Sequence, residues 1–186
     1  MFNPEAAAAV AGFFLSRAKG KSLTDLALMK LFFLTERTAL AETTSLITGD
    51  NFVSMKFGPV LSNTYDLLRG KYTAKEGAIW REHFTYLPKD GDRSNTVRLD
   101  REIDPAEILS EYEIEVLARI WKEYGEADKW KLVKMTHDFK EWDKRAADLG
   151  TSIPMPVERI FKLGFGLEPE EAKARAMELE FFEAVA

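Results

Sequence analysis

The side chains that could carry acid–base chemistry gather in one stretch, from His137 to Asp143. This stretch holds one imidazole and the carboxylates of Asp138, Glu141 and Asp143. A histidine beside a carboxylate can act as a general acid or base. No serine nucleophile motif or glycine loop accompanies it in the sequence. We therefore interpret His137 as a structural residue near a helix end, packed beside Trp142. The alternative is a hydrolase in which His137 lies exposed beside a carboxylate in a substrate pocket.

Metal and thiol chemistry have little support in the composition. The chain has no cysteine, which excludes disulfides, zinc–thiolate sites and thiol nucleophiles. The other histidine, His83, has no second imidazole or thiol to complete a metal site, and we interpret it as a surface residue of a strand. The sequence thus predicts no catalytic residue, no metal site and no cofactor.

The overall composition is that of one domain with a sizeable core, at 186 residues and 46% hydrophobic. A formal net charge of −5 argues against nucleic acid as the main ligand, because phosphate binding depends on clustered Lys and Arg. The sequence has no signal-peptide pattern and no apolar run near the roughly 20 residues that span a bilayer. We therefore expect a cytoplasmic protein with no membrane partner.

Helix signals dominate the first part of the chain. Asn3 is placed to cap a helix that ends at about Ala18. The stretch Ser22–Asp25 has capping-box form and predicts a long helix from about Leu23 to Thr43. Apolar side chains cover most of its circumference, so we expect a central, largely buried helix. Its charged positions should mark the sides that reach solvent or a partner: Lys30, Glu36, Arg37 and Glu42.

The chain changes its hydrophobic period at its first Gly-Pro pair. Phe52–Phe57 is predicted as a short strand, Gly58-Pro59 as a rigid corner, and Leu61–Arg69 as a helix closed by Gly70. Tyr65 shares a face of that helix with leucines, so we expect it to be buried or half-buried.

A second strand pattern follows. Trp80–Leu87 and Asn95–Leu99 read as a hairpin whose loop is Pro88–Arg93. We expect this hairpin to join the strand before the Gly-Pro pair in one small antiparallel sheet.

The remaining elements are predicted to be helical. A full capping box begins a helix over Glu111–Tyr124, and Asp128 caps the next one. Beyond Gly150 a Pro-punctuated connector leads to a short helix, Val157–Leu163, and a last helix from Glu170 to about Val185.

The predicted fold class is α+β and predominantly helical: a helical bundle around a central buried helix, with a small antiparallel sheet of about three strands. We expect residues 1–149 to form one domain. Residues 150–186 would then be a helical C-terminal extension that packs on the domain or on a partner.

Two short motifs, in order, resemble the Panacea domain family, also called SocA-like. The first is Lys30-Leu-Phe-Phe-Leu followed by the Lys56-Phe-Gly-Pro-Val corner and a helical tyrosine; the second is Thr-His followed by Trp142. The resemblance spans roughly residues 8–146. It implies mostly structural roles, with partner contact at some positions, for the signature residues Lys30, Lys56, Phe57, Gly58, Pro59, Val60, Tyr65, Thr136, His137 and Trp142.

The chain also departs from the family pattern. Phe57 stands where the corner usually has tyrosine, and Glu141 stands where proline usually precedes Trp142. The Glu36-Arg37 pair occupies a region of the long helix that often carries an aromatic residue. These departures bear on partner contacts more than on the fold.

The resemblance implies a non-enzymatic antitoxin of a bacterial or phage toxin–antitoxin system, which neutralises a cognate toxin by direct protein–protein binding. The acidic net charge would suit a basic toxin. One branch of the family is a proteolytic adaptor, which makes a ClpXP-type protease a second expected partner. The sequence does not decide whether the chain also forms a homo-oligomer. The alternative is a DNA-binding regulator of its own operon, although no basic helix-turn-helix segment is visible.

Overall fold

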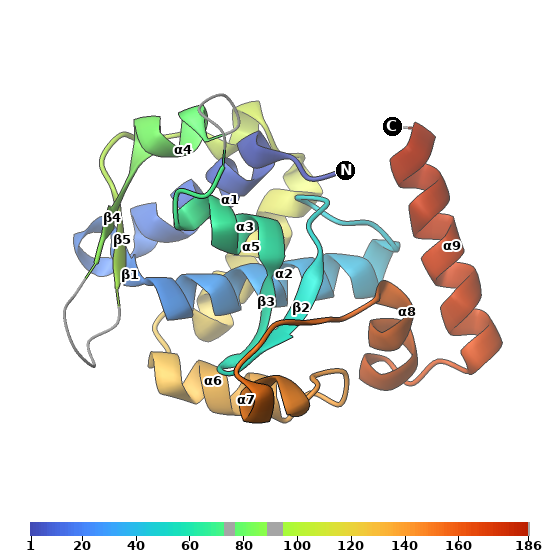
Figure 1. Ribbon diagram of the computed structural model, residues 1–186. Coiled ribbons are helices and arrows are strands. Elements are labelled where there is room, and N and C mark those ends of the chain that lie inside the picture. Colours follow the sequence, from blue (N-terminus) through green and yellow to red (C-terminus); the bar gives the residue numbers. More distant parts are fainter. Residues whose placement is uncertain (73–76, 89–94, 186) are drawn as a thin grey trace.

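Helix α2 (Asp25–Thr43) runs through the middle of the molecule, and the other elements surround it (Figure 1). The computed structural model describes residues 1–72, 77–88 and 95–185. In α2 every side chain from Ala27 to Glu36 is buried. The predicted central helix is therefore confirmed, as is the α+β, predominantly helical fold class.

Two of the charged side chains on α2 are buried, although the sequence predicted that they reach solvent or a partner. Lys30 and Glu36 are fully buried and Arg37 is half-buried, so only Glu42 is exposed as expected. Lys30 donates to a backbone carbonyl, and Glu36 accepts from two amides of the loop that follows α2. The expectation that these two charges reach solvent is wrong, because distant backbone groups replace the water that each would otherwise bind.

The first helix, α1 (Pro4–Arg17), is capped as predicted, since Asn3 Oδ1 accepts from the amides of Glu5 and Ala6 at 3.0 and 3.1 Å. The other helices and helical turns follow in chain order. They are a 3₁₀ turn (Lys19–Lys21), α3 (Ser62–Leu68), α4 (Ala78–His83), a 3₁₀ turn (Pro105–Glu107), α5 (Glu111–Tyr124), α6 (Lys129–His137), α7 (Arg145–Leu149), α8 (Val157–Arg159), a π-helical turn (Ile160–Gly164) and α9 (Pro169–Val185).

The capping box expected at Ser22 is instead a strand. Strand β1 (Ser22–Thr24) pairs with β5 (Thr96–Leu99), which pairs in turn with β4 (Phe84–Leu87) in an antiparallel sheet. Helix α2 is capped two residues later, where Thr24 Oγ1 accepts from Ala27 N at 3.2 Å. Pairing with a strand some 70 residues away along the chain thus overrides a local helix signal.

The strand expected over Trp80–Leu87 begins only at Phe84. The residues before it form α4, so His83 ends a helix rather than facing outward from a strand, and its Nδ1 lies 2.9 Å from Arg101 O. All of the predicted hairpin loop except Pro88 lies outside the described residues.

A second three-stranded antiparallel sheet contains the Gly-Pro pair. Strand β2 (Phe52–Met55) pairs with β3 (Gly58–Leu61) on one side and with β6 (Ile153–Pro154) on the other. The predicted corner is therefore wrong: Lys56-Phe57 makes the turn, and Gly58-Pro59 begins the returning strand. Pro59 is tolerated because β3 is an edge strand of this sheet. The prediction that β2 shares a sheet with β4 and β5 is also wrong.

The first part of the C-terminal segment packs on the core of the molecule. β6 extends the second sheet, and Ile160 and Phe161 are buried in the same hydrophobic cluster as α2. Helix α9 (Figure 1) stands at one side of the molecule and buries its own Ala172 and Leu179 side chains. We propose that residues 1–149 form the domain and that residues 150–186 are an extension docked on it.

Helix α3 starts without a capping side chain of its own, and Asp50 supplies the cap from the preceding loop. Asp50 Oδ1 accepts from Asn63 N at 2.9 Å, and Oδ2 accepts from Thr64 N and Thr64 Oγ1, both at 2.7 Å. The carboxylate is almost fully buried. It therefore satisfies the helix-terminal amides that water cannot reach.

We expect Asp50→Ala to lower the free energy of unfolding by roughly 3 kcal/mol, because buried donors lose a charged acceptor. Urea unfolding followed by circular dichroism measures this. The matched control is Asp104→Ala, which removes an exposed cap from the Pro105–Glu107 turn and should cost about 1 kcal/mol or less. Equal losses in the two variants would show that α3 needs no cap from Asp50.

Candidate functional site

The signature residues of α2, β3 and α6 meet in the interior. Lys30 Nζ donates to Pro59 O at 2.7 Å. Gly58 has φ +95°, and a Cβ placed on it would lie 2.8 Å from Lys30 Nζ and 2.9 Å from Thr136 Oγ1. Only a residue without a side chain fits between the lysine and the threonine in this conformation. We refer to Lys30, Gly58, Pro59, Thr136 and His137 as the signature cluster.

His137 lies at the edge of the signature cluster and packs as predicted. Its ring stacks on that of Trp142, with centroids 4.0 Å apart and planes 7° from parallel. Trp142 Nε1 donates to Met55 O at 3.2 Å, so the stack also holds the end of β2. Burial lowers the pKa of His137, and the nearby charge of Lys30 lowers it further. The neutral imidazole is thereby favoured.

The carboxylates near His137 in the sequence are engaged elsewhere. Glu141 is fully buried, and its Oε1 lies 2.6 Å from Arg37 Nε. Asp143 pairs with Arg145, which lowers the pKa of Asp143 to about 2. The hydrogen bonds of the described residues therefore assemble no His–carboxylate pair.

Lys30 is the most perturbed base of the signature cluster. Its side chain is fully buried, and burial lowers its pKa to about 7. A fully buried amine is typical of either a structural tie or a reactive group. Here its partner is a backbone carbonyl of the edge strand, which favours the structural role.

The other signature positions lie apart from this interior. Val60 is buried in the hydrophobic core, and Tyr65 is half-buried as expected, with the Arg69 guanidinium 5.1 Å from its ring centroid. Lys56 and Phe57 form the exposed turn between β2 and β3. The Phe57 ring contacts Trp130 of α6, with centroids 5.8 Å apart.

Two of the positions that depart from the family pattern, Arg37 and Glu141, meet each other and the C-terminal segment. The Arg37 guanidinium lies over the rings of Phe139 and Phe165, at 4.4 and 4.8 Å from their centroids. It pairs with Glu141 and also donates to Gly164 O at 3.2 Å. Sequence reasoning missed this junction, although an arginine on a helix that is apolar over most of its circumference was a signal for a partner elsewhere in the fold.

A second contact strengthens the same junction. Arg159 Nε donates to Glu141 O at 2.7 Å. Glu141 Oε2 is buried without a hydrogen-bond partner among the described residues. The backbone of Glu141 therefore binds the extension directly, through Arg159. Its side chain binds Arg37, which in turn binds Gly164 of the extension.

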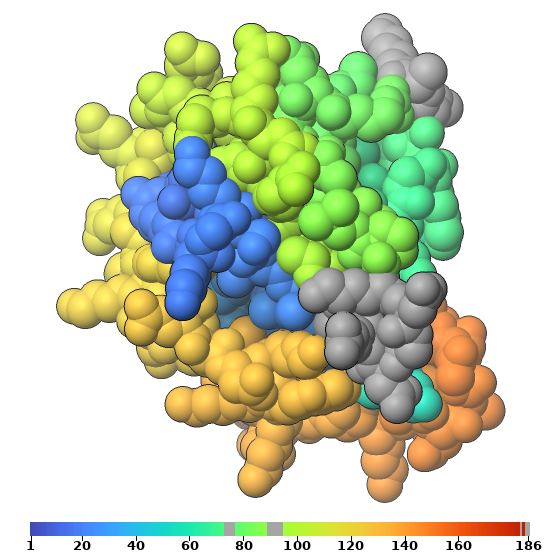
Figure 2. Space-filling model, turned by 90° about the vertical axis from the view of Figure 1, so that its left-hand side faces the viewer, coloured from blue at the N-terminus to red at the C-terminus, as the bar shows by residue number. Residues whose placement is uncertain are grey.

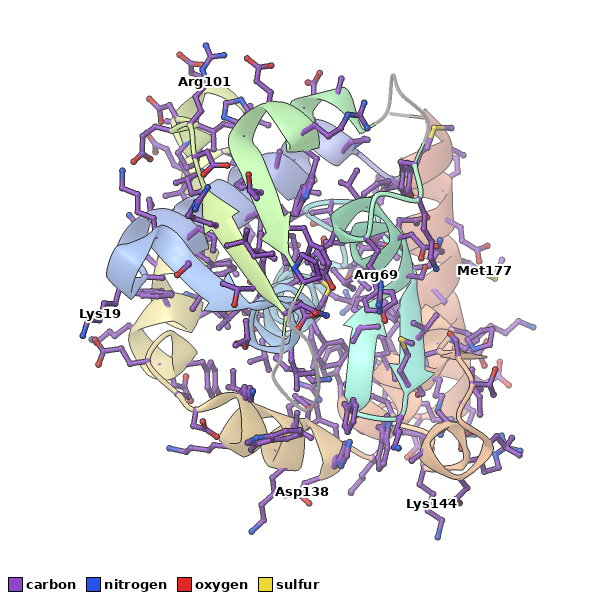
Figure 3. All side chains as sticks on the ribbon, turned by 60° about the vertical axis from the view of Figure 1, so that its left-hand side comes forward. Lys19, Arg69, Arg101, Asp138, Lys144 and Met177 are labelled. Carbon is purple, nitrogen blue, oxygen red and sulfur yellow. The ribbon has the colours of Figure 1, made fainter. Side chains whose placement is uncertain are left out.

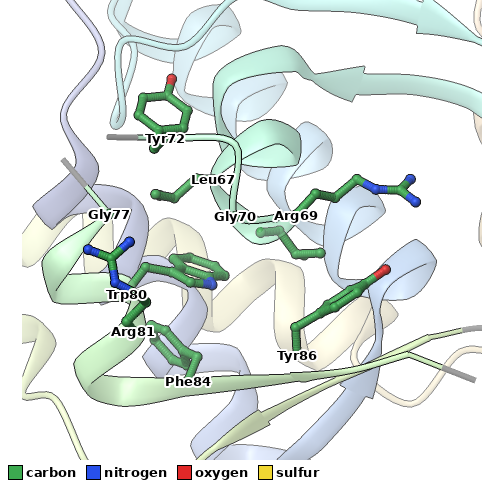
Figure 4. A pocket seen from close by; sticks show the side chains of 10 residues that line it. Leu67, Arg69, Gly70, Tyr72, Gly77, Trp80, Arg81, Phe84 and Tyr86 are labelled. Atoms are coloured by element: carbon green, nitrogen blue, oxygen red, sulfur yellow. The ribbon is translucent and has the colours of Figure 1, made fainter. Parts of the chain in front are cut away.

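A small cavity lies between α3, α4 and β4 (Figure 4). Its volume is about 180 Å³, and its walls include Trp80, Phe84, Tyr86 and two arginines, Arg69 and Arg81. Ligand sites are usually about 300 Å³ or larger. This cavity suits one side chain better than a substrate, and its described lining holds no carboxylate or histidine.

Two further searches cover the described residues. No group of three or more His, Cys, Asp or Glu side chains in this part of the chain could hold a metal ion. None of the described helices is both long and apolar enough to cross a membrane.

Comparison with known proteins gave one result. A family model described as "Antitoxin SocA-like, Panacea domain" matches residues 28–143. The matched region contains every signature residue. Comparisons with curated proteins and with solved structures found no match.

Lys30 makes a testable contribution to the pH dependence of stability. Because its pKa is about 7 when folded and near 10.5 when unfolded, the unfolded chain binds more protons between these values. The contribution of Lys30 to stability therefore rises with pH across that window. We expect the unfolding free energy of wild type minus that of Lys30→Met to increase from pH 7 to pH 10, by at most roughly 4 kcal/mol.

Urea unfolding at pH 7, 8, 9 and 10 measures this difference. The matched control is Lys134→Met, which removes the charge of an exposed lysine of α6 and so separates the effect of a lost lysine charge from that of the buried site. A flat difference for Lys30→Met would mean that folding leaves the pKa of Lys30 unchanged, and a falling one that folding raises it; either result would contradict the prediction.

Arg37→Ala should release the C-terminal segment, because it leaves the buried Glu141 carboxylate without its cation. We expect faster hydrogen exchange in residues 157–166, while the amides of α1 keep their protection. Arg119→Ala is the control: it removes an ion pair with Glu42 in which both side chains are exposed, at 47% and 37%, and should leave exchange in residues 157–166 unchanged. If Arg37→Ala accelerated exchange evenly over the whole chain, the pair would be a general stabiliser and not a tie to the extension.

Proposed function

The chain belongs to the SocA-like antitoxin family with a Panacea domain, and we propose that it neutralises a cognate toxin by binding it directly. The observation that carries this proposal is the family match over residues 28–143, which is more than half of the chain. The family supports an antitoxin-like role and suggests a toxin as partner in general terms. Direct neutralisation, the toxin–antitoxin pair and its origin in a bacterial genome or prophage are our proposals.

The proposed mechanism is occlusion of the toxin's active or target-binding surface in a stable complex. The geometry of the signature cluster supports it, because the groups that could react are tied up in the fold. Lys30 bonds to a carbonyl, His137 stacks on Trp142, and Glu141 pairs with Arg37. Occlusion needs a rigid surface and no reactive group. We propose that the complex forms in the cytoplasm.

Delivery of the toxin to a ClpXP-type protease is a second way to reach the same result. The two modes differ in what happens to the toxin. Occlusion leaves its amount unchanged, whereas delivery shortens its half-life when the protease is present.

Co-expression with the product of the adjacent gene tests the proposal. We expect that product to arrest growth alone, the chain to restore growth, and the two proteins to purify together as one complex. Toxin levels with and without the protease then separate occlusion from delivery. An adjacent product that is neither toxic nor bound would contradict the proposed function, and a shift of upstream DNA across a salt series would favour the regulator instead.

His137→Gln discriminates binding from hydrolysis in the same assay. It keeps a planar polar side chain beside Trp142 but removes the titratable ring. We expect growth rescue to persist as long as the variant stays folded. Loss of rescue by a folded variant that still binds the toxin would point to an enzyme.

A further inference from the structure

Two exposed aromatic rings lie together at the outer end of the β2–β3 hairpin. Phe57 is 45% exposed and Trp130 is 50% exposed, and their rings meet edge to face. The turn contributes one ring and α6 the other. Paired, half-exposed aromatic side chains are characteristic of the centre of a protein–protein interface.

Lysines surround this aromatic pair. Lys56 Nζ lies 5.6 Å from the centroid of the Phe57 ring, and Lys129 Nζ lies 5.4 Å from that of Trp130. Lys134, one turn further along α6 on the face of Trp130, is exposed. Neither Lys56 nor Lys134 has an ion-pair partner among the described residues. We call Lys56, Phe57, Trp130 and Lys134 the hairpin patch.

The surroundings of the patch continue its character. Lys140 and Lys144 are also exposed and lie on the segment that follows α6. Figure 3 shows Lys144 projecting from the same edge of the molecule as Asp138, which caps the end of α6. Long side chains also project from the surface of α6 in the space-filling view, in the amber region of Figure 2.

The hairpin patch rests on a rigid base. On one side of the turn Trp142 Nε1 donates to Met55 O, and on the other Lys30 Nζ donates to Pro59 O. Gly58, the first residue after the turn, is enclosed by the signature cluster. A turn held on both sides loses little conformational freedom on binding, which favours affinity.

We propose that the hairpin patch is the surface that binds the toxin, and that it fits an acidic protein surface with an apolar centre. This inference rests on the proposed function. The aromatic pair requires an apolar contact, and the lysines around it require carboxylates. The net charge alone pointed to a basic toxin, but this face carries charge of the opposite sign to the chain as a whole.

Nucleic acid also binds surfaces made of lysines and aromatic rings. Two exposed carboxylates argue against it here, because Asp128 and Asp138 bracket α6 at its two ends. A continuous phosphate backbone laid along α6 would meet both of them. Separate carboxylates on a protein can instead pair with the lysines between them.

The test measures binding of the purified adjacent gene product by titration calorimetry. The double variant Phe57→Ala/Trp130→Ala is expected to bind at least about thirtyfold more weakly than wild type. Phe181→Ala/Phe182→Ala on α9 is the matched control, because these two rings are 63% and 55% exposed, and it should bind like wild type. Thermal unfolding establishes that each variant is folded.

A charge variant keeps the test decisive if the aromatic double variant is unstable. Lys134→Glu should weaken binding about tenfold at 50 mM salt and by much less at 300 mM, because salt screens the attraction between exposed charges. Lys173→Glu, an exposed lysine of α9, is its control and should have no effect.

The outcomes separate the two proposals. If wild type does not bind the adjacent product, the proposed function and this inference fall together. If wild type binds but the hairpin variants bind equally well, or the α9 variants alone lose binding, only the inference is overturned. Binding of a 20-nucleotide probe that depends on Phe57 and Trp130, with toxin binding unaffected by them, would also overturn it.

Discussion

The buried amino group of Lys30 ties together three elements that are distant in the sequence. It comes from α2, bonds to Pro59 of β3, and lies beside Thr136 of α6. A buried amine must be satisfied by hydrogen bonding, so the strand cannot move without leaving it unpaired. This contact fixes one side of the β2–β3 turn, which carries Phe57, and the bond from Trp142 Nε1 to Met55 O fixes the other.

Local signals in the sequence were reliable wherever a helix depends on its own ends. The caps at Asn3, Ser110 and Asp128 each start a helix as predicted, because capping is decided within a few residues. The capping pattern at Ser22 failed, since β1 pairs with β5 far along the chain. The corner predicted at Gly58-Pro59 was wrong for the same reason. Whether the Gly-Pro pair makes a corner or a returning strand depends on the partner across the turn, which the local pattern does not reveal.

The candidate site was predictable in its members but not in its geometry. The family resemblance named Lys30, Gly58 and His137, yet nothing in their spacing says that a glycine lies between a lysine and a threonine. Burial of Lys30 and Glu36 was missed because charged residues on a helix ordinarily face water. The contact between Phe57 and Trp130 was missed for two reasons. The hydrophobic pattern of α6 treats Trp130 as one more apolar position, and the two residues are over 70 positions apart in the sequence.

The junction of Arg37, Glu141 and Gly164 has a consequence for how this chain could be recombined with its relatives. A segment that covers an ion pair cannot be exchanged by itself: residues 150–186 grafted onto another domain would bring the Gly164 carbonyl without the arginine that donates to it. The original domain, without the extension, would have its Arg37–Glu141 pair exposed to solvent. The residues that would have to be exchanged together are therefore discontinuous in the sequence: Arg37 in α2, Glu141 after α6, and the C-terminal extension.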